Sequence, residues 1–526
     1  MPEQLLKARS NDPTVIYGGQ ALHSRYDPRG EAEKYIASLR LKNDIRFFVL
    51  IECGLGYIIP PLRKNFPKAK IIAVHASAYF SDITARIASF YSPASYDAGE
   101  LLPDSRWFPG YGKNQDIDTF LEGEIPDTDA AFIKIVEWRP GLTVYRNAYA
   151  EIMSKAVNCI KRLDANKRTV RGFGCRWVRN FFRNIRIMRR ALSLRQPVDL
   201  PFIVCGAGPG LEGVIPLLRE LKDKARVFVL AASSAAEALL AGGVHLDIVI
   251  GTDGGGWALF HLWEYLRLPP ENTGALAVQS CAAIPSQCTD VPLLTLADGS
   301  LWQGTALSSC GIPFIRLPQR GTVTASALDL AFKLNQGPVF ICGMNLASED
   351  IVSHARPYRL NGMMEEKAAR LSPYYSQQFI RTRALRKGGM DIYARWFKDR
   401  LASYPERLYT LGKNHSVFDA LPKGEDILLK RVSPRPRSSA AGRLLEERDV
   451  YLPCRQERLF AETSLNPNEN RADTALKAVL RAFDNPQLSP LVQGELAPLL
   501  FPDEEQVSCS ALRKKIARAA QGGRLE

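Results

Sequence analysis

Several short motifs that mark large enzyme classes are absent from this 526-residue sequence. It has no GxxxxGKS/T phosphate loop, no HExxH zinc motif, no GxSxG nucleophile turn and no protein-kinase catalytic string. The sequence therefore gives no support to a P-loop nucleotide hydrolase, a zinc protease, a serine hydrolase or a protein kinase.

Clustered metal ligands and cysteine pairs are also missing. The six histidines and ten cysteines are dispersed, and no two cysteines form a CxxC pair. We therefore predict no metal site, no disulfide framework and a reducing compartment. No run approaches 18 uncharged apolar residues, so no membrane span is expected. Because the first ten residues are polar and charged, we also expect no signal peptide and a cytoplasmic location.

The sequence does contain enough apolar residues for a sizeable core, together with an excess of positive charge. Hydrophobic residues make up 46%, and 69 Lys and Arg against 55 Asp and Glu give a net charge of +14. Eleven of the basic residues lie between 161 and 190, with Asp164 as the one acid there. A basic surface suits nucleic acid, anionic lipid, nucleotide phosphates or acidic sugars. We assign no nucleic-acid partner, and the length predicts two or three domains.

The first predicted domain spans residues 1–162. An apolar run at 45–51 is followed by the turn Gly54-Leu55-Gly56, a short helix and a second apolar run at 70–74, which is the start of a βαβ unit. A later strand of the same sheet is expected at 131–138. The second strand ends at His75, where a dehydrogenase or methyltransferase would carry an acid. We therefore favour a structural or degenerate role for this first glycine turn.

Residues 163–197 are predicted to form a basic helical linker. Trp177, Phe181, Ile185 and Met188 recur at helical spacing and mark one apolar face, while arginines mark another. A solvated helix packed between domains and a docking face for an acidic partner both fit this pattern.

The central domain is predicted at 198–420, and residues 421–526 are expected to form a helical region. Short apolar runs that alternate with helical stretches imply a parallel, doubly wound sheet, which binds ligands at the carboxyl ends of its strands. The predicted fold class is α/β, with two Rossmann-like doubly wound units and a helical C-terminal region. Strands are expected at 201–205, 226–231, 246–252, 274–279, 312–316 and 338–343, and the main helices at 211–222, 233–242 and 322–335.

A glycine turn, Gly206 to Gly210, follows the first strand of the central domain and opens a helix. The string at 208–213 fits GxGxxG, and backbone N–H groups left free in such a turn can hold phosphate. The next strand ends at Ser233 and Ser234 without a carboxylate, which disfavours NAD and suggests a nucleoside close to the backbone. A tight strand–helix turn without a ligand is the alternative.

Two more side chains at predicted strand ends could act chemically. Asp253 precedes three glycines and could orient a sugar hydroxyl, bind Mg²⁺ or act as a base; capping of the next helix is the alternative. His354 follows the strand at 338–343, and a neutral imidazole there could take a proton from an attacking hydroxyl. A lone surface histidine is the alternative for His354. Arg356 and Tyr358 would suit phosphate or carboxylate recognition.

The order and spacing of these motifs resemble a known family. GAGPGL at 206–211, GTV at 321–323 and GMNLA at 343–347, together with Asp247, Asp253 and His354, resemble the bacterial motility-associated factor (Maf) flagellin glycosyltransferases. Their central domain is of the 6-hydroxymethylpterin diphosphokinase-like type and is similar to bacterial sialyltransferases. The likeness covers about residues 40–420, including the first glycine turn.

That resemblance implies a cytoplasmic glycosyltransferase that moves a nonulosonic acid, of sialic or pseudaminic type, from a CMP-activated donor to Ser or Thr of flagellin. No metal or other cofactor is implied. His354 would be the general base, and Asp253 would orient donor or acceptor. The residues assigned to the nucleotide sugar are Gly206, Gly208, Pro209, Gly210, Ser233 and Ser234 at the cytidine, Gly321, Thr322 and Thr324 at the phosphate, Gly343 and Asn345 in the neighbouring loop, and Asn414 and Ser416 closing the pocket.

Three positions depart from the family pattern. This chain has Gly210 where the family usually has a serine, Asn345 where it has an aspartate, and His75 where it has an acid. These departures leave two alternatives open. One is diphosphate transfer to a hydroxymethylpterin, which would depend on ATP and Mg²⁺. The other is a non-catalytic accessory protein that binds flagellin through a decayed site.

Overall fold

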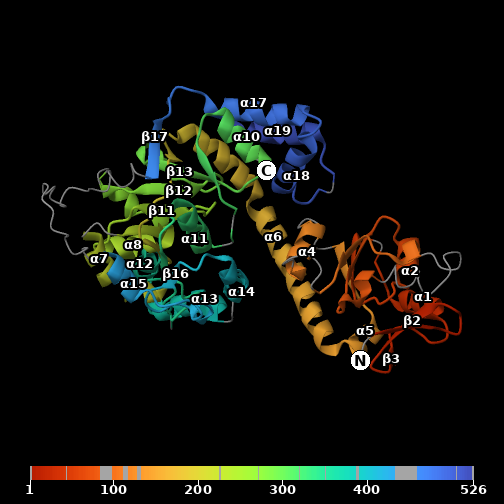
Figure 1. Ribbon diagram of the computed structural model, residues 1–526. Coiled ribbons are helices and arrows are strands. Elements are labelled where there is room, and N and C mark those ends of the chain that lie inside the picture. The colour runs from red at the N-terminus through yellow and green to blue at the C-terminus, as the bar shows by residue number, and fades with distance from the viewer. Residues whose placement is uncertain are drawn as a thin grey trace, which may run out of the picture. The chain divides into compact units, whose positions relative to one another are not determined.

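The computed structural model describes residues 3–42, 44–82, 98–109, 116–126, 129, 132–223, 227–269, 272–318, 320, 322–349, 351–386, 390–432, 459–504 and 506–523. The chain forms two compact units, Met1–Gly172 and Phe173–Glu526, each with its own sheet and core (Figure 1). The predicted α/β class, with parallel sheets and a helical C-terminal region, is confirmed.

The first unit is built on a parallel sheet whose described strands have the order β6-β5-β4-β7. β4 is central because all five of its residues are apolar and buried, as expected for a strand covered on both faces. The sequence did not predict the small antiparallel sheet β1-β2-β3 or the short edge strand β6. The elements of this unit are β1 Gln4–Lys7, β2 Pro13–Tyr17, β3 Gln20–Ala21, α1 Pro28–Ser38, β4 Phe47–Ile51, α2 Ile59–Asn65, β5 Lys70–Val74, β6 Ser105–Trp107, α4 Ile117–Glu124, β7 Ile133–Glu137 and α5 Arg139–Val144.

One 42-residue helix, α6 (Arg146–Ile187), begins in the first unit and ends in the second. Its early turns bury apolar side chains in the core of the first unit. Its last turns bury Phe181 and Ile185 in the core of the second unit, as the predicted apolar face requires. The predicted linker at 163–197 is therefore helix as far as residue 187. Its last part is strand β8 (Arg190–Leu194), whose central residues are buried in the larger sheet.

The second unit contains a sheet of ten strands in its described residues. The order is β16-β15-β9-β10-β11-β12-β13-β8-β17, with β14 also pairing with β13, and the pairing of β8 with β17 is antiparallel. Strand order reverses at β9, because β10 to β13 extend on one side of it and β15 and β16 on the other. Open α/β sheets bind ligands at such a reversal. The strands are β8 Arg190–Leu194, β9 Phe202–Cys205, β10 Phe228–Ala232, β11 Ile248–Gly251, β12 Ala275–Gln279, β13 Leu293–Ala297, β14 Phe314–Arg316, β15 Val339–Cys342, β16 Leu408–Thr410 and β17 Phe460–Ser464.

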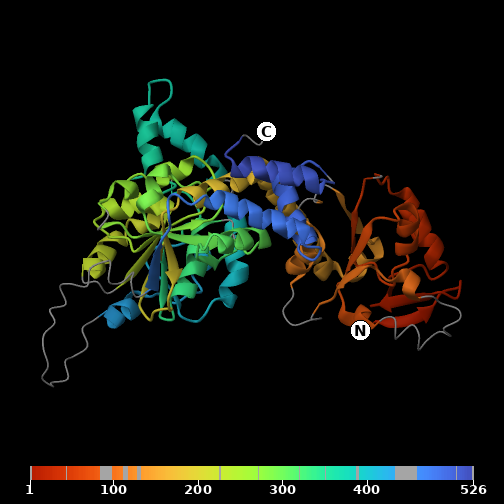
Figure 2. The ribbon, with the colours of Figure 1, turned by 90° about the horizontal axis from the view of Figure 1, so that it is seen from above.

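Helices cover both faces of this sheet (Figures 1 and 2). Successive residues of a strand point to opposite faces, so Ile203 joins one core with α7, α8, α10 and the C-terminal helices, whereas Phe202 and Val204 join the other core with α11. The helices are α7 Ile215–Asp223, α8 Ala236–Ala241, α9 Trp257–Leu262, α10 Leu301–Ser309, α11 Val323–Leu334, α12 Arg359–Glu366, α13 Tyr374–Arg386, α14 Asp391–Arg400, α15 Glu425–Val432, α17 Arg471–Asp484, α18 Ser489–Leu500 and α19 Cys509–Ala520.

The predicted C-terminal region is largely helical, but it is not separate from the sheet. β17 pairs with β8 along its whole length, and α17 and α18 pack on α10. The buried guanidinium of Arg471 in α17 donates to the carbonyl oxygens of Ile185, Asn466 and Met188. One side chain therefore joins the end of α6 to the loop before α17 through three backbone carbonyls.

Candidate functional site

A cavity of about 650 Å³ opens at the carboxyl edge of the large sheet, a size typical of small-molecule sites. Three residues that the sequence analysis singled out lie on its wall: Ser234 after β10, Asp253 after β11 and His354 after β15. Loops that are far apart in the sequence meet here because parallel strands end at one edge. The other lining residues are Trp257, His261, Tyr358, Leu360, Met363, Met364, Lys367, Gln377 and Arg381, mostly from α9, α12 and α13.

The ring of His354 is fixed by stacking. It lies on the ring of Tyr358 with the centroids 4.2 Å apart and the planes at 8°, and its Nδ1 is 2.9 Å from Ser353 Oγ. Burial lowers the pKa of His354 to about 3, and the positive charge of Arg381 acts in the same direction. The imidazole is therefore neutral at pH 7, and one of its nitrogens has a lone pair that can accept a proton.

A second histidine, His261 of α9, stacks on the same tyrosine with ring centroids 5.8 Å apart. Burial lowers the pKa of His261, against the opposing charge of Asp253. Its Nδ1 is buried and has no hydrogen-bond partner in the part of the chain that the structure describes. A buried polar atom without a partner costs free energy, so this nitrogen is a candidate contact for a bound molecule. The sequence analysis missed His261, because it lies within a helix and no strand-end pattern marks it.

Asp253 is held in place by its own loop and by α6. Its Oδ1 accepts the N–H of Gly255 at 2.7 Å, and its backbone oxygen accepts the N–H of Ala283 at 2.8 Å. Asn180 of α6 donates to the carbonyl of Gly254 at 3.0 Å and to that of Cys281 at 3.2 Å. The carboxylate does not cap α9, which begins after Gly256 without a side-chain cap, so the capping alternative is wrong. Asn180 therefore joins α6 to the loop that carries Asp253, a contact that the sequence analysis missed.

The glycine turn after β9 is packed against the loop after β15. The N–H groups of Gly206 and Gly208 donate to the carbonyls of Cys342 and Gly343, each at 2.8 Å, and the N–H of Gly210 donates to Asn345 Oδ1 at 2.9 Å. The expectation that these groups are free for phosphate is therefore wrong. A Cβ at Gly208 would lie 2.3 Å from Asn345 Oδ1, so glycine is needed there for close approach of the two loops. Contact of this turn with a nucleotide stays a prediction.

The loop after β15 is fastened by two asparagines that the sequence analysis assigned to the nucleotide sugar. Asn345 Oδ1 accepts the N–H of Gly210, and Asn345 Nδ2 donates to Glu349 Oε1 at 3.4 Å. Asn414 Oδ1 accepts the N–H of Met344 at 2.9 Å, and its Nδ2 donates to the carbonyl of Leu411 at 3.0 Å. Both side chains are therefore occupied in joining loops. An aspartate at position 345 would accept the Gly210 N–H equally well, so the departure from the family pattern keeps this contact.

The remaining predicted site residues lie near the sheet edge but outside the cavity wall. Thr322 is the N-cap of α11, with Oγ1 accepting the N–H of Ala325 at 3.1 Å. Arg356 forms a bidentate ion pair with Glu212, with both N–O distances 3.1 Å, so it is already paired. Gly321 lies outside the described residues. The structure places Gly206, Gly208, Pro209, Gly210, Ser233, Thr324, Gly343 and Ser416 close to these loops but not among the residues that line the cavity.

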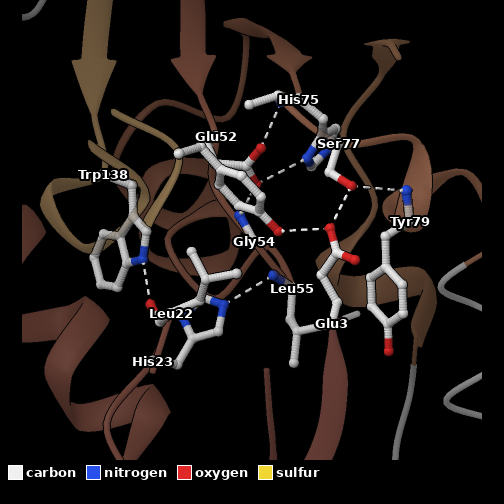
Figure 3. A network of polar contacts seen from close by, with 12 residues as sticks. Glu3, Leu22, His23, Glu52, Gly54, Leu55, His75, Ser77, Tyr79 and Trp138 are labelled. Atoms are coloured by element: carbon white, nitrogen blue, oxygen red, sulfur yellow. Dashed lines mark hydrogen bonds and ion pairs between the residues drawn. The ribbon is translucent and has the colours of Figure 1, made fainter. Parts of the chain in front are cut away.

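The glycine turn of the first unit is satisfied by protein groups (Figure 3). Glu52, at the end of β4, accepts the N–H groups of Gly54 and Ala76 at 3.3 and 2.5 Å, and its Oε1 is 3.4 Å from His75 Nδ1. His23 Nε2 accepts the N–H of Leu55 at 2.8 Å. A Cβ at Gly54 would lie 2.4 Å from that histidine ring. These contacts favour the structural role over a ligand site.

Within the described residues, no helix is long and apolar enough to cross a membrane. The same residues contain no group of three or more His, Cys, Asp or Glu side chains that could hold a metal ion.

Comparison with known proteins connects this geometry to a family. Residues 176–350 match the family model described as 6-hydroxymethylpterin diphosphokinase MptE-like. The chain is also similar to uncharacterised proteins of Treponema pallidum (strain Nichols). One is 25% identical over 304 residues, which cover 57% of this chain and 64% of the relative's own length. Another is 25% identical over 429 residues, which cover 79% of this chain and 71% of the relative.

The solved structure of a Maf glycosyltransferase from Magnetospirillum magneticum AMB-1 is similar along nearly the whole chain. The TM-score is 0.53 at 13% identity, and the match covers 99% of this chain and 85% of that one. At this identity the likeness establishes the fold. Residues 176–350 of the second unit are therefore similar to the MptE-like family. The chain as a whole has the architecture of a Maf glycosyltransferase, and the resemblance predicted from the sequence is confirmed.

Proposed function

We propose that this protein is a glycosyltransferase that moves a nonulosonic acid from a CMP-activated donor to a Ser or Thr hydroxyl of flagellin in the cytoplasm. The observation that carries the proposal is the cavity at the carboxyl edge of the sheet. It gathers Ser234, Asp253 and a neutral, fixed His354 in a chain with the fold of a Maf glycosyltransferase. A cavity of about 650 Å³ is within the size range of pockets that bind ligands of this kind.

In the proposed reaction the acceptor hydroxyl oxygen attacks the anomeric carbon of the sugar. The bond between that carbon and the phosphate oxygen breaks, and CMP leaves with the electron pair. The proton of the hydroxyl passes to the ring nitrogen of His354 that carries the lone pair, so His354 acts as the general base. Asp253 accepts a hydrogen bond from a sugar or acceptor hydroxyl and orients it. The reaction balances without a metal or a redox partner.

Ligand binding gives the first test. CMP should raise the melting temperature of the protein more than CDP or UDP, because one phosphate is sufficient in this scheme. Equal melting temperatures with all three nucleotides and without them would count against a CMP-linked donor.

Transfer gives the second test, with CMP-N-acetylneuraminic acid as donor and flagellin as acceptor, followed by intact-protein mass. His354→Ala should abolish the sugar increment and keep the CMP shift. His245→Ala is the matched control, because that histidine is exposed and does not line the cavity. Wild-type protein that binds flagellin and CMP but adds no mass would instead favour the accessory role.

The match of residues 176–350 to the MptE-like family favours one second candidate, diphosphate transfer from ATP to a hydroxymethylpterin. That reaction would depend on Mg²⁺. Release of AMP from ATP with hydroxymethyldihydropterin and Mg²⁺ would support it, and turnover with the CMP donor in the presence of EDTA would support the glycosyltransferase.

A further inference from the structure

Two cations line the cavity without a carboxylate partner. Among the described residues, Arg381 of α13 and Lys367, which follows α12, form no ion pair with an acid. The one acid on the same wall is Asp253. Lys367 is exposed and Arg381 is half-buried in a mostly apolar wall, where a charge is partly shielded from water and is stabilised by an opposite charge. With two cations and one acid, this wall favours the binding of an anion.

Arg381 is oriented by neighbours that do not neutralise it. Its NH1 donates to Asn361 Oδ1 at 3.0 Å, and its Cζ lies 5.5 Å from the centre of the Tyr358 ring. Asn361 Oδ1 also accepts from Gln378 Nε2 at 3.2 Å, so the amide stays satisfied without the arginine. A guanidinium held at one nitrogen keeps further N–H groups for a carboxylate or phosphate.

We infer that Arg381, assisted by Lys367, forms an anion subsite beside His354 that selects donors by a negatively charged group. The inference rests on the proposed function. It extends that function by naming the feature of the donor that is recognised, either the carboxylate of an acidic sugar or the phosphate of the nucleotide. Both groups match the planar, bidentate hydrogen bonding of arginine.

The same geometry couples donor binding to the base. Arg381 contacts the tyrosine on which His354 stacks, and its charge is one of the causes that lower the pKa of His354. An anion bound to Arg381 offsets that charge and raises the proton affinity of His354. The base therefore becomes stronger when the donor is present.

The test compares two matched pairs of probes by calorimetry on the full chain: N-acetylneuraminic acid with its methyl ester, and CMP with cytidine. The wild type should bind the charged member of at least one pair about tenfold more tightly. The sugar pair identifies the carboxylate as the recognised group, and the nucleotide pair identifies the phosphate. Arg381→Gln should bring both members of that pair within about twofold. Arg381→Lys should keep part of the preference. Arg383→Gln is the control, because that arginine is exposed on the same helix and does not line the cavity.

Equal binding of both members in both pairs by the wild type would overturn the inference, as would a preference that survives Arg381→Gln. The proposed function is judged separately by transfer from CMP-N-acetylneuraminic acid. Transfer with unchanged donor KM in Arg381→Gln keeps the function and removes the subsite. An Arg381-dependent preference for anions in a protein without His354-dependent transfer keeps the subsite and removes the function. If Arg381→Gln does not fold, Arg381→Lys should still weaken the preference in part and Lys367→Gln should reduce it, and an unchanged preference in both would overturn the inference.

Discussion

The packing of the glycine turn against a distant loop makes Gly210 sensitive to a single methyl group. An ideal Cβ at Gly210 would lie 2.1 Å from the carbonyl oxygen of Lys413 and 2.9 Å from Asn345 Oδ1. The first of these atoms belongs to the backbone, so it cannot rotate away. Alanine at this position must therefore push the two loops apart by about 1 Å to reach a normal contact distance.

That displacement acts on several hydrogen bonds at once. The loop that carries Lys413 is fixed by Asn414 and by the N–H of His415, which donates to the carbonyl of Met344 at 2.9 Å. Overpacking of a close contact of this kind costs about 1–3 kcal/mol. For a unit of this size, that free energy corresponds to a fall of about 1–4 °C in Tm.

Gly213→Ala provides the matched control in the same segment. Its ideal Cβ has Gly210 O at 3.9 Å as the nearest atom, so the methyl group fits without displacement. Thermal unfolding of the full chain should show a lower Tm for Gly210→Ala and an unchanged one for Gly213→Ala. Amide exchange should rise at Gly206, Gly208 and Met344 in the first variant. Equal Tm values for the two variants would refute the close packing of these loops.

Other perturbations have equally definite outcomes. Burial lowers the pKa of His23 to about 3, as it does for His354, so the unfolded chain binds more protons than the native one between about pH 3 and 6.5. Stability should therefore be fully present above pH 6.5 and fall as the pH drops, by about 1.4 kcal/mol per pH unit for each histidine, and His23→Gln should flatten the slope in urea titrations. Arg471→Met should lower the free energy of unfolding by about 3 kcal/mol or more, because three carbonyls lose a donor, whereas the exposed Arg481→Met should not. Asn180→Ala should reduce transfer more than it reduces Tm, since its amide holds the loop of the cavity carboxylate; a loss of Tm alone would contradict that role. EDTA should leave transfer unchanged, and loss of activity restored by Mg²⁺ would contradict the metal-independent scheme.

Local pattern was sufficient to predict the strands whose carboxyl ends meet at the cavity, but not the helices α9, α12 and α13 that supply most of its wall. β9, β10, β11 and β15 are short apolar runs between glycine and helix signals, and each lies within about two residues of its expected position. The same pattern put Ser234, Asp253 and His354 at strand ends, which parallel topology brings to one edge. β8, β13, β16 and β17 of the same sheet were missed. β13 lies in a stretch where no predicted helix separates it from the neighbouring strands, and β17 has only Phe460 as a large apolar residue.

The sequence by itself determined the α/β class, the parallel direction of the central strands and the edge at which chemistry is expected, because these follow from periodicity over a few residues. Only the tertiary structure decided which groups are free at that edge. The N–H of Gly210 is taken by Asn345, 135 residues later, and Arg381 reaches the cavity from a helix whose own pattern carries no sign of it. Both depend on how loops and helices far apart in the chain pack together. Such contacts are fixed by the shape and burial of the whole unit, which no local run of residues encodes.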